Sequence, residues 1–64
     1  MPFYFEYALY SPSADAWYTG RAGEHWIGPK RDAYTYTAAG AYRKAELFNR
    51  GAFSIRDWRV CRIL

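Results

Sequence analysis

A change of hydrophobic period within residues 33–51, AYTYTAAGAYRKAELFNRG, constrains the fold more than any other feature of this chain. Its first part alternates small side chains or threonines with two tyrosines, as a β-strand over 33–37 does. The alanines that follow favour a helix, Thr37 is a suitable N-cap, and Gly51 is a suitable residue after the last turn. We therefore expect a strand and then a helix of about 12 residues.

The first twenty residues predict an antiparallel hairpin. Residues 3–10, FYFEYALY, alternate strictly, with one face formed by Phe3, Phe5, Tyr7 and Leu9 and the other by Tyr4, Glu6, Ala8 and Tyr10. Residues 11–15, SPSAD, contain turn formers, and AWYTG at 16–20 is a returning strand that Gly20 ends.

Residues 20–32 contain glycines, a proline and several charges, which suit a loop. Trp26 and Ile27 interrupt this loop, either as a short edge strand or as a plug over one end of the core. The tail over 53–64 predicts a final strand, in which Trp58, Val60 and Leu64 alternate with Arg59, Cys61 and Ile63. The chain is thus predicted to be a single α+β domain, 1–64, with a small antiparallel sheet of three to four strands, one helix packed across it, and the order β-β-β-α-β.

One side of the predicted helix consists mostly of alanine. At about 100° per residue, this side is formed by Ala38, Ala41, Tyr42, Ala45 and Phe48. Small residues allow a helix to lie close to a sheet, where the rings of the strands supply packing volume. Arg43 and Leu47 lie on the opposite side, with Lys44 at its edge, so Leu47 either covers loop 20–32 or contacts a partner.

Aromatic residues make up 22% of this 64-residue chain. A chain of this size buries only about 60% of the surface that its unfolded form exposes. One helix on one small sheet cannot enclose all these rings, so we expect some of them at the surface or in contact with a partner.

Cys61 is the only cysteine and His25 the only histidine, which leaves no material for an intrachain disulfide framework or an ordinary zinc site. The opening MPFYFEYALY has no signal-peptide pattern, and no run of about 18 apolar residues occurs in the sequence. We expect a protein without metal or cofactor in a reducing cytoplasm, neither secreted nor membrane-spanning.

The net charge of +3 is unevenly distributed along the chain. Residues 1–29 carry one arginine against three carboxylates, whereas residues 30–64 carry eight lysines or arginines against three carboxylates. The second half is therefore basic. Such a surface suits nucleic acid or an acidic protein patch, although a solvated basic face is an equally good interpretation.

The sequence offers little material for catalysis. His25 lies in a predicted loop and Cys61 in a predicted strand, the carboxylates form no paired acid/base pattern, and no P-loop or dinucleotide fingerprint occurs. We therefore expect no enzymatic activity. The sequence is better suited to binding another molecule. Seven of the nine cations are arginines, and Arg, Tyr and Trp are enriched in interface hot spots.

A resemblance to known proteins rests on three segments of the sequence, which are WYTG at 17–20, YTAAGAYRKA at 36–45 and WRV at 58–60. In this order the chain resembles small proteins encoded by phages and prophages, in which a tyrosine hairpin ending in Y-T-G precedes a helix and a terminal W-x-V strand. It is similar in this respect to the anti-CRISPR class, although its charged loop 21–32 departs from the pattern. The resemblance implies an inhibitor in the bacterial cytoplasm that binds a CRISPR-Cas effector protein, such as a type I surveillance complex, and blocks target-DNA recruitment or nuclease engagement by steric occlusion.

Two candidate partner-binding surfaces follow from the residues. One combines Tyr34 or Tyr36 with Arg43, Lys44 and Leu47, and the other is formed by Arg56, Arg59 and Arg62. The alternative function is a small basic nucleic-acid-binding accessory protein, in which Trp58 stacks on bases between these tail arginines. A structural or toxin-neutralising partner protein is a third possibility. We expect a monomer or a homodimer, with strand 3–10 either paired across a two-fold axis or covered by loop 20–32.

Overall fold

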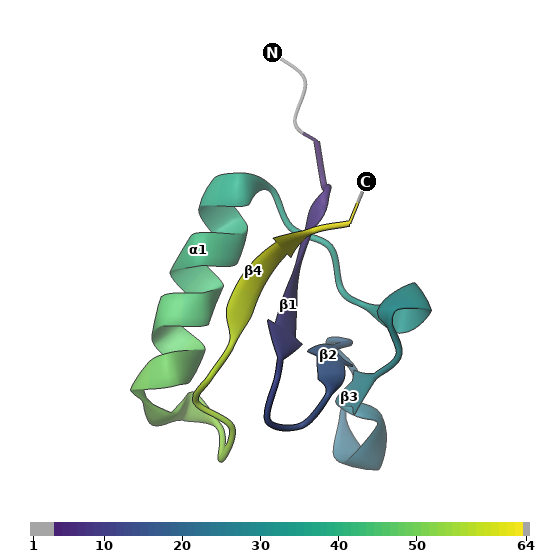
Figure 1. Ribbon diagram of the computed structural model, residues 1–64, viewed down its shortest axis with the longest axis vertical. Helices are drawn as coiled ribbons and strands as arrows, with labels where there is room; N and C mark the ends of the chain where they lie inside the picture. Colours follow the sequence, from purple (N-terminus) through teal and green to yellow (C-terminus); the bar gives the residue numbers. More distant parts are fainter. Residues whose placement is uncertain (1–3, 64) are drawn as a thin grey trace.

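The computed structural model describes residues 4–63, which contain four antiparallel strands and one α-helix (Figure 1). In chain order these elements are β1 (Tyr7–Ser11), β2 (Ala16–Tyr18), β3 (Ile27–Gly28), α1 (Ala38–Leu47) and β4 (Arg59–Arg62). The strands lie in the order β3-β2-β1-β4, and α1 packs on β1 and β4. The predicted α+β class is confirmed, and the elements follow one another as β-β-β-α-β, although the third strand is not the predicted segment.

The β1–β2 hairpin forms as predicted, with both strands shorter than expected. β1 begins at Tyr7, so residues 4–6 of the strand predicted over 3–10 are not part of it, and residue 3 lies outside the described residues. β2 ends at Tyr18, so the strand predicted over 16–20 continues too far. The chain turns immediately afterwards at Gly20, whose φ of 77° lies in the left-handed region that only glycine adopts easily.

The third strand comes from the predicted loop and not from residues 33–37. β3 pairs with β2 at one edge of the sheet, which confirms the edge strand suggested for this part of the loop. Residues 33–37 make only one bridge, in which Tyr7 and Tyr36 exchange N–H···O bonds of 3.0 and 2.7 Å. The amide of Tyr34 donates to the carbonyl of Tyr18 (2.8 Å). The predicted strand over 33–37 is therefore wrong, because this segment only fills the place beside β1 where the short β2 has ended.

α1 begins at the predicted cap and ends at Leu47, and Gly51 interrupts the helical turn that follows it. The hydroxyl of Thr37 accepts a hydrogen bond from the amide of Gly40 (3.2 Å), as an N-cap does. After Leu47 the chain continues as a wider π-helical turn over Phe48–Ala52. Gly51 interrupts this turn with a φ of 113°, a conformation that a residue with a Cβ rarely adopts. The predicted cap and the predicted terminal glycine are both confirmed.

The core lies between α1 and the sheet. Its buried members are Leu9, Ala41, Ala45, Phe48 and Trp58. The half-buried rings of Tyr18, Trp26 and Phe53 pack against them, and the rings of Trp26 and Phe53 lie 4.9 Å apart. Trp26 therefore packs against the core, while the next residue joins the edge strand. The two alanines let α1 lie close to the sheet, as the sequence predicts.

β4 is an edge strand and covers only part of the strand predicted over 53–64, of which residue 64 lies outside the described residues. The residues between α1 and β4 form a loop, which the side-chain amide of Asn49 fastens to the end of α1. This amide accepts a bond from the backbone N–H of Trp58 (2.8 Å) and donates to its C=O (3.0 Å). β1 lies between β2 and β4. Both edges of β1 are therefore already paired, which contradicts the idea that this strand lies at an edge of the sheet, while the choice between a monomer and a homodimer stays a prediction.

A polar cluster ties the β1–β2 turn to the chain before β4. Asp57 accepts bonds from the hydroxyls of Ser11 (2.6 Å) and Ser13 (2.9 Å) and from the amide of Ser13 (2.8 Å). Ser11 is fully buried, so Asp57 satisfies a hydroxyl that water cannot reach. The bond from Ser11 is the largest influence on this carboxyl and, with the bonds from Ser13 and against the opposing effect of burial, holds the pKa of Asp57 below its usual range.

We predict that Leu9→Ala lowers the free energy of unfolding by about 3 kcal/mol, because it removes a fully buried side chain and leaves a cavity. Leu47→Ala is the matched control, since Leu47 is 49% exposed and its truncation should change stability by less than about 0.5 kcal/mol. Urea unfolding followed by tryptophan fluorescence measures both. Equal losses in the two variants would contradict the packing described here.

We predict that Asp57→Asn makes stability less sensitive to acid. Because folding lowers this pKa, the ionised carboxylate stabilises the fold fully above the unfolded value of about 3.9. The contribution is lost as the pH falls through the lower folded value. Thermal unfolding of both chains from neutral to acidic pH measures the effect: the two melting curves should converge at the acidic end. A difference that is independent of pH would contradict the role of the charge.

Candidate functional site

The residues predicted to bind a partner lie in three separate places. They are Tyr34 and Tyr36 before α1, Arg43, Lys44 and Leu47 on α1, and Arg56, Arg59 and Arg62 in or near β4. Among residues 4–63, no hydrogen bond, ion pair or ring contact joins one of these groups to another. The combination of the tyrosines with the helix residues therefore has no direct contact to support it.

Tyr34 and Tyr36 differ in how far they are available to a partner. Their rings lie 4.9 Å apart, and Tyr36 is held to β1 by its backbone bonds to Tyr7. Burial, followed by the neighbouring phenols of Tyr18 and Tyr34, raises the pKa of Tyr36 to about 12. Tyr34 is half exposed and packs over Gly20, where an added Cβ would lie only 2.6 Å from its ring. Tyr34 alone is therefore free to present its ring edge to another molecule.

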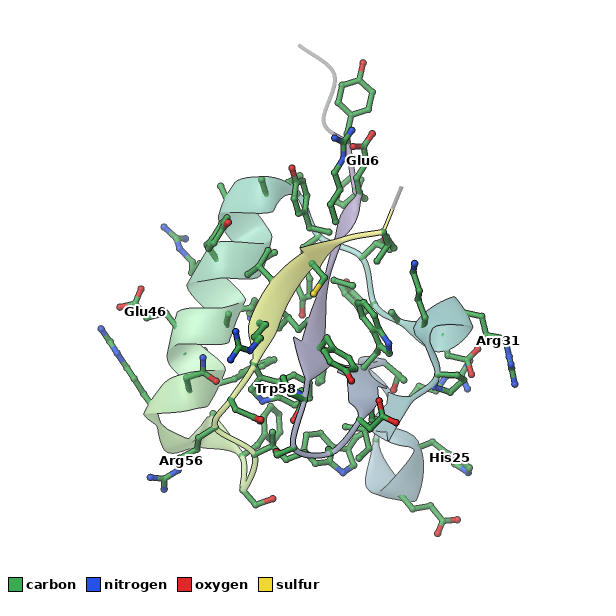
Figure 2. All side chains as sticks on the ribbon, viewed as in Figure 1. Glu6, His25, Arg31, Glu46, Arg56 and Trp58 are labelled. Atoms are coloured by element: carbon green, nitrogen blue, oxygen red, sulfur yellow. The ribbon has the colours of Figure 1, made fainter. Side chains whose placement is uncertain are left out.

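The tail arginines do not alternate with an accessible tryptophan. Trp58 is 3% exposed, and Figure 2 shows it inside the fold, whereas Arg56 lies at the surface. The predicted stacking of Trp58 on bases is therefore wrong, because the ring fills the core under α1. Arg62 pairs with Glu6 at 3.1 Å, and Arg59 is exposed on β4 opposite Tyr10 of β1.

Tyr42 is a surface residue that the helical pattern wrongly placed in the core. Its side chain is 65% exposed, although its neighbour Ala41 is fully buried. The buried side of α1 is centred on Ala41, Ala45 and Phe48, so Tyr42 lies about 100° round the helix at the margin of this side. Its hydroxyl favours this margin, where an amphipathic ring keeps its polar end in water. That marginal position on the helix is the signal that could have identified it.

The exposed side of α1 combines apolar and cationic groups. We define the α1 outer surface as Tyr42, Arg43 and Leu47, which are all exposed. Arg43 and Leu47 are one turn apart and are neighbours on the helix, while Tyr42 lies on the other side of Arg43. The surface thus has a cation between two large apolar side chains. Arg, Tyr and Trp dominate hot spots, and fixed helical positions keep such groups in place.

Ion pairs neutralise only part of the basic charge near α1 and β4. On α1, Glu46 pairs with Arg50 one turn later, on the outer side of the helix (Figure 2). The cations of this region that make no ion pair within residues 4–63 are Arg43, Lys44, Arg56 and Arg59. These cations give the α1 and β4 region a positive potential that favours an anionic partner.

The sheet face opposite α1 carries a second group of aromatic residues, which pack against one another and against a nearby lysine. The rings of Tyr10 and Trp17 lie 5.0 Å apart, and the ammonium of Lys30 lies 6.0 Å from the Trp17 ring. The hydroxyl of Tyr10 donates to Asp15 (2.7 Å), and this bond is the main cause that raises the pKa of Tyr10. Both rings are half-buried, so this face offers less open aromatic surface than α1.

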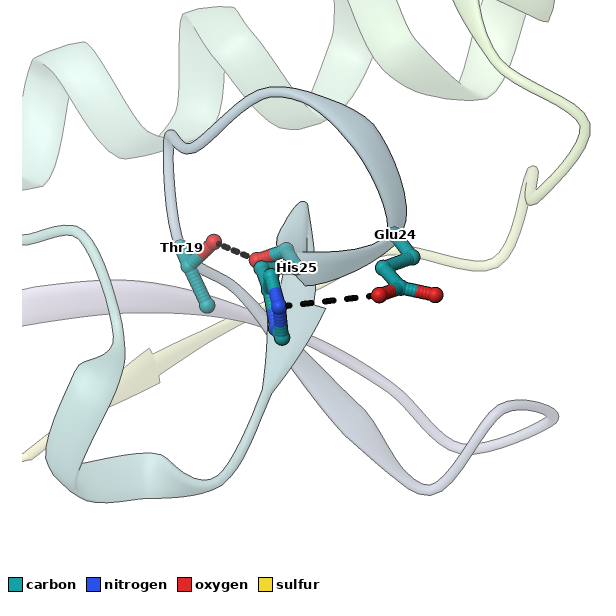
Figure 3. A network of polar contacts seen from close by, with 3 residues as sticks. All are labelled: Thr19, Glu24 and His25. Carbon is teal, nitrogen blue, oxygen red and sulfur yellow. Dashed lines mark hydrogen bonds and ion pairs between the residues drawn. The ribbon is translucent and has the colours of Figure 1, made fainter.

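The single histidine belongs to a loop network without catalytic geometry (Figure 3). The hydroxyl of Thr19 donates to the backbone carbonyl of His25, and the imidazole of His25 lies 3.8 Å from the carboxylate of Glu24. Both side chains are exposed to solvent. The Thr19 hydroxyl donates its proton to a backbone hydrogen bond that closes the loop before β3. The network therefore has a structural role.

We predict that Tyr36→Phe removes the step near pH 12 from the titration of phenolate absorbance. Folding raises this pKa above the unfolded value of about 10. The neutral phenol therefore stabilises the fold fully below the unfolded pKa of about 10, and this contribution is lost as the pH rises through about 12. Tyr4→Phe, at an exposed position, is the control and should leave the step in place. A step that persists in Tyr36→Phe would show that another tyrosine produces it.

Comparison with known proteins finds no protein-family model, curated protein or solved structure that matches the chain. Within residues 4–63, no three side chains among His, Cys, Asp and Glu are grouped so that they could hold a metal ion. None of the helices in this range has the length and apolar character that a membrane crossing requires. The strongest candidate site is the α1 outer surface with the neighbouring cations, because Tyr42 and Leu47 are large and exposed on either side of Arg43.

Proposed function

We propose that this chain is a stoichiometric protein-binding module that contacts its partner through the α1 outer surface. The observation that carries the proposal is the exposure of Tyr42 (65%) and Leu47 (49%) on either side of Arg43. Large apolar groups in water cost free energy that a matching partner surface recovers. Arg43, without an ion pair among the described residues, adds a donor that fits a carboxylate in two bonds.

Hydrogen bonds at both ends hold α1 rigidly in place, which favours tight binding of a partner. The helix is capped by Thr37 at one end and fastened at the other by the bonds between Asn49 and Trp58. The exposed side chains therefore project from a backbone that is already in its bound conformation. Such preorganisation reduces the entropy lost on association, which matters for a small surface.

A CRISPR-Cas effector subunit is the partner that the resemblance to phage-encoded proteins supports, with inhibition by steric occlusion in the bacterial cytoplasm. The inhibitor covers the surface that recruits target DNA or engages the nuclease. The cations Arg43, Lys44, Arg56 and Arg59 favour an acidic patch on that subunit. No cofactor or metal takes part in this mode of action.

Nucleic acid is the alternative ligand, and it has less support. Trp58, the ring proposed to stack on bases, is 3% exposed. The exposed cations Arg56 and Arg59 still suit a phosphate backbone. An affinity for DNA or RNA that falls steeply with salt would favour this alternative.

We predict that the tagged protein captures an effector subunit from a lysate of a CRISPR-carrying bacterium, with or without nuclease treatment. The double variant Tyr42→Ala/Leu47→Ala should reduce the captured amount by about tenfold or more, because both truncations remove interface area. Mass spectrometry of the bound fraction measures the result. Tyr4→Ala, an exposed aromatic residue outside α1, is the matched control and should retain capture.

Two results would overturn the proposal. Loss of every partner on nuclease treatment would make nucleic acid the ligand. Equal capture by the double variant and the control, with both chains folded, would show that the α1 outer surface is not the contact.

A further inference from the structure

The outer edge of β4 presents backbone groups that no other strand uses. β4 is the last strand of the sheet and, within residues 4–63, pairs only with β1. The amide of Ile63 donates to the carbonyl of Glu6 (2.8 Å), which continues this pairing beyond β4. In an antiparallel ladder, alternate residues face the partner strand, so Val60 and Arg62 direct their N–H and C=O groups away from β1.

Asn49 already occupies the preceding position on this edge. Its side-chain amide bonds both the N–H and the C=O of Trp58, as the backbone of a neighbouring strand would. The next outward groups, on Val60 and Arg62, have no hydrogen-bond partner within residues 4–63. The edge is therefore filled at its first position and open at the next two.

Tyr42 stands beside the open part of this edge. Tyr42 and Asn49 are seven residues apart and so lie on nearly the same side of the helix, the side that reaches the outer edge of β4. α1 and β4 run in opposite directions (Figure 1). Seven helical residues span about 10 Å, which equals about three strand residues beyond Trp58. This spacing places Tyr42 at about the level of Cys61 and Arg62 along β4, on the side of α1 that faces the unpaired groups.

The exposed arginines near the β4 edge determine which kind of segment can pair with it. Arg59 on β4 and Arg56 just before it are exposed and make no ion pair within residues 4–63. A second copy paired through β4 would bring the arginines of both copies together, and like charges across a strand pair are destabilising. A segment with carboxylates would instead gain from the same residues.

We propose that the β4 edge binds an extended acidic segment of the partner protein by strand addition. The main chain of that segment bonds to Val60 and Arg62, an apolar side chain packs on Tyr42, and carboxylates meet Arg59. This inference rests on the proposed protein-binding function and names the chemistry of the partner. It also explains the position of Tyr42, since a ring at this place can serve the α1 outer surface and the β4 edge together.

A titration of the isotope-labelled full chain with a short peptide that alternates Glu with Val and Thr tests the inference. Amide NMR signals of Val60 and Arg62 should shift, and their hydrogen exchange should slow, because both amides gain acceptors. Val60→Pro removes one outward N–H at a position where an edge strand tolerates proline. It should weaken binding by about threefold to tenfold, the effect of one main-chain hydrogen bond.

Two further variants keep the test valid if Val60→Pro impairs folding. Tyr42→Ala changes an exposed side chain and should also weaken the peptide, whereas Leu47→Ala, on the far side of α1 from this edge, should leave peptide binding unchanged. A peptide with Lys in place of Glu is the charge control and should bind about tenfold more weakly or worse.

Several results would overturn strand addition. These are absence of amide shifts up to millimolar peptide, equal binding of the Lys peptide, and protection of Val60 and Arg62 that depends on protein concentration without peptide, which would mean a second copy. The same shifts at lower concentrations of single-stranded DNA would make nucleic acid the occupant. Partner capture from lysate that Val60→Pro retains and Leu47→Ala loses would overturn strand addition while leaving the protein-binding function in place.

Discussion

The close approach of α1 to the sheet is the constraint on which the rest of this fold depends. Ala41 and Ala45 leave room for Leu9 and Trp58 to fill the space between the layers. A larger residue at either alanine would push the helix away and open voids around the rings, and a chain this small has little stability to lose. The same closeness excludes Tyr42 from the interface, so the packing of the core determines what the surface presents.

Trp58 joins the core to the edge of the sheet. The rings of Tyr18, Trp26 and Phe48 surround it edge to face, with ring centres 6.0 to 6.1 Å away. Its indole nitrogen is the one buried side-chain polar atom without a hydrogen-bond partner in the described part of the chain. The backbone of Trp58 is fully bonded through Asn49, so the residue holds α1, the loop and β4 in one arrangement.

This arrangement gives the two candidate contact regions different physical characters. The α1 outer surface offers side chains on a rigid helix, whereas the β4 edge offers main-chain donors and acceptors beside Arg59. Exposed cations on an edge strand disfavour pairing with a second copy of the same edge, and the same charges would favour the acidic segment that we propose. A partner that meets both regions gains specificity from shape and from charge.

Local chemistry in the sequence determined the hairpin, the cap at Thr37, the stop at Gly51 and the alanine side of the helix, because each depends on neighbouring residues alone. The fold class followed from these elements. Tertiary structure alone decided that residues 33–37 make one bridge, that β1 is central, that Trp58 is buried and that Tyr42 is exposed. These outcomes depend on which distant segments compete for the same place in the sheet and core. An amphipathic ring suits both the core and the surface, so its place is set only by the residues that pack around it.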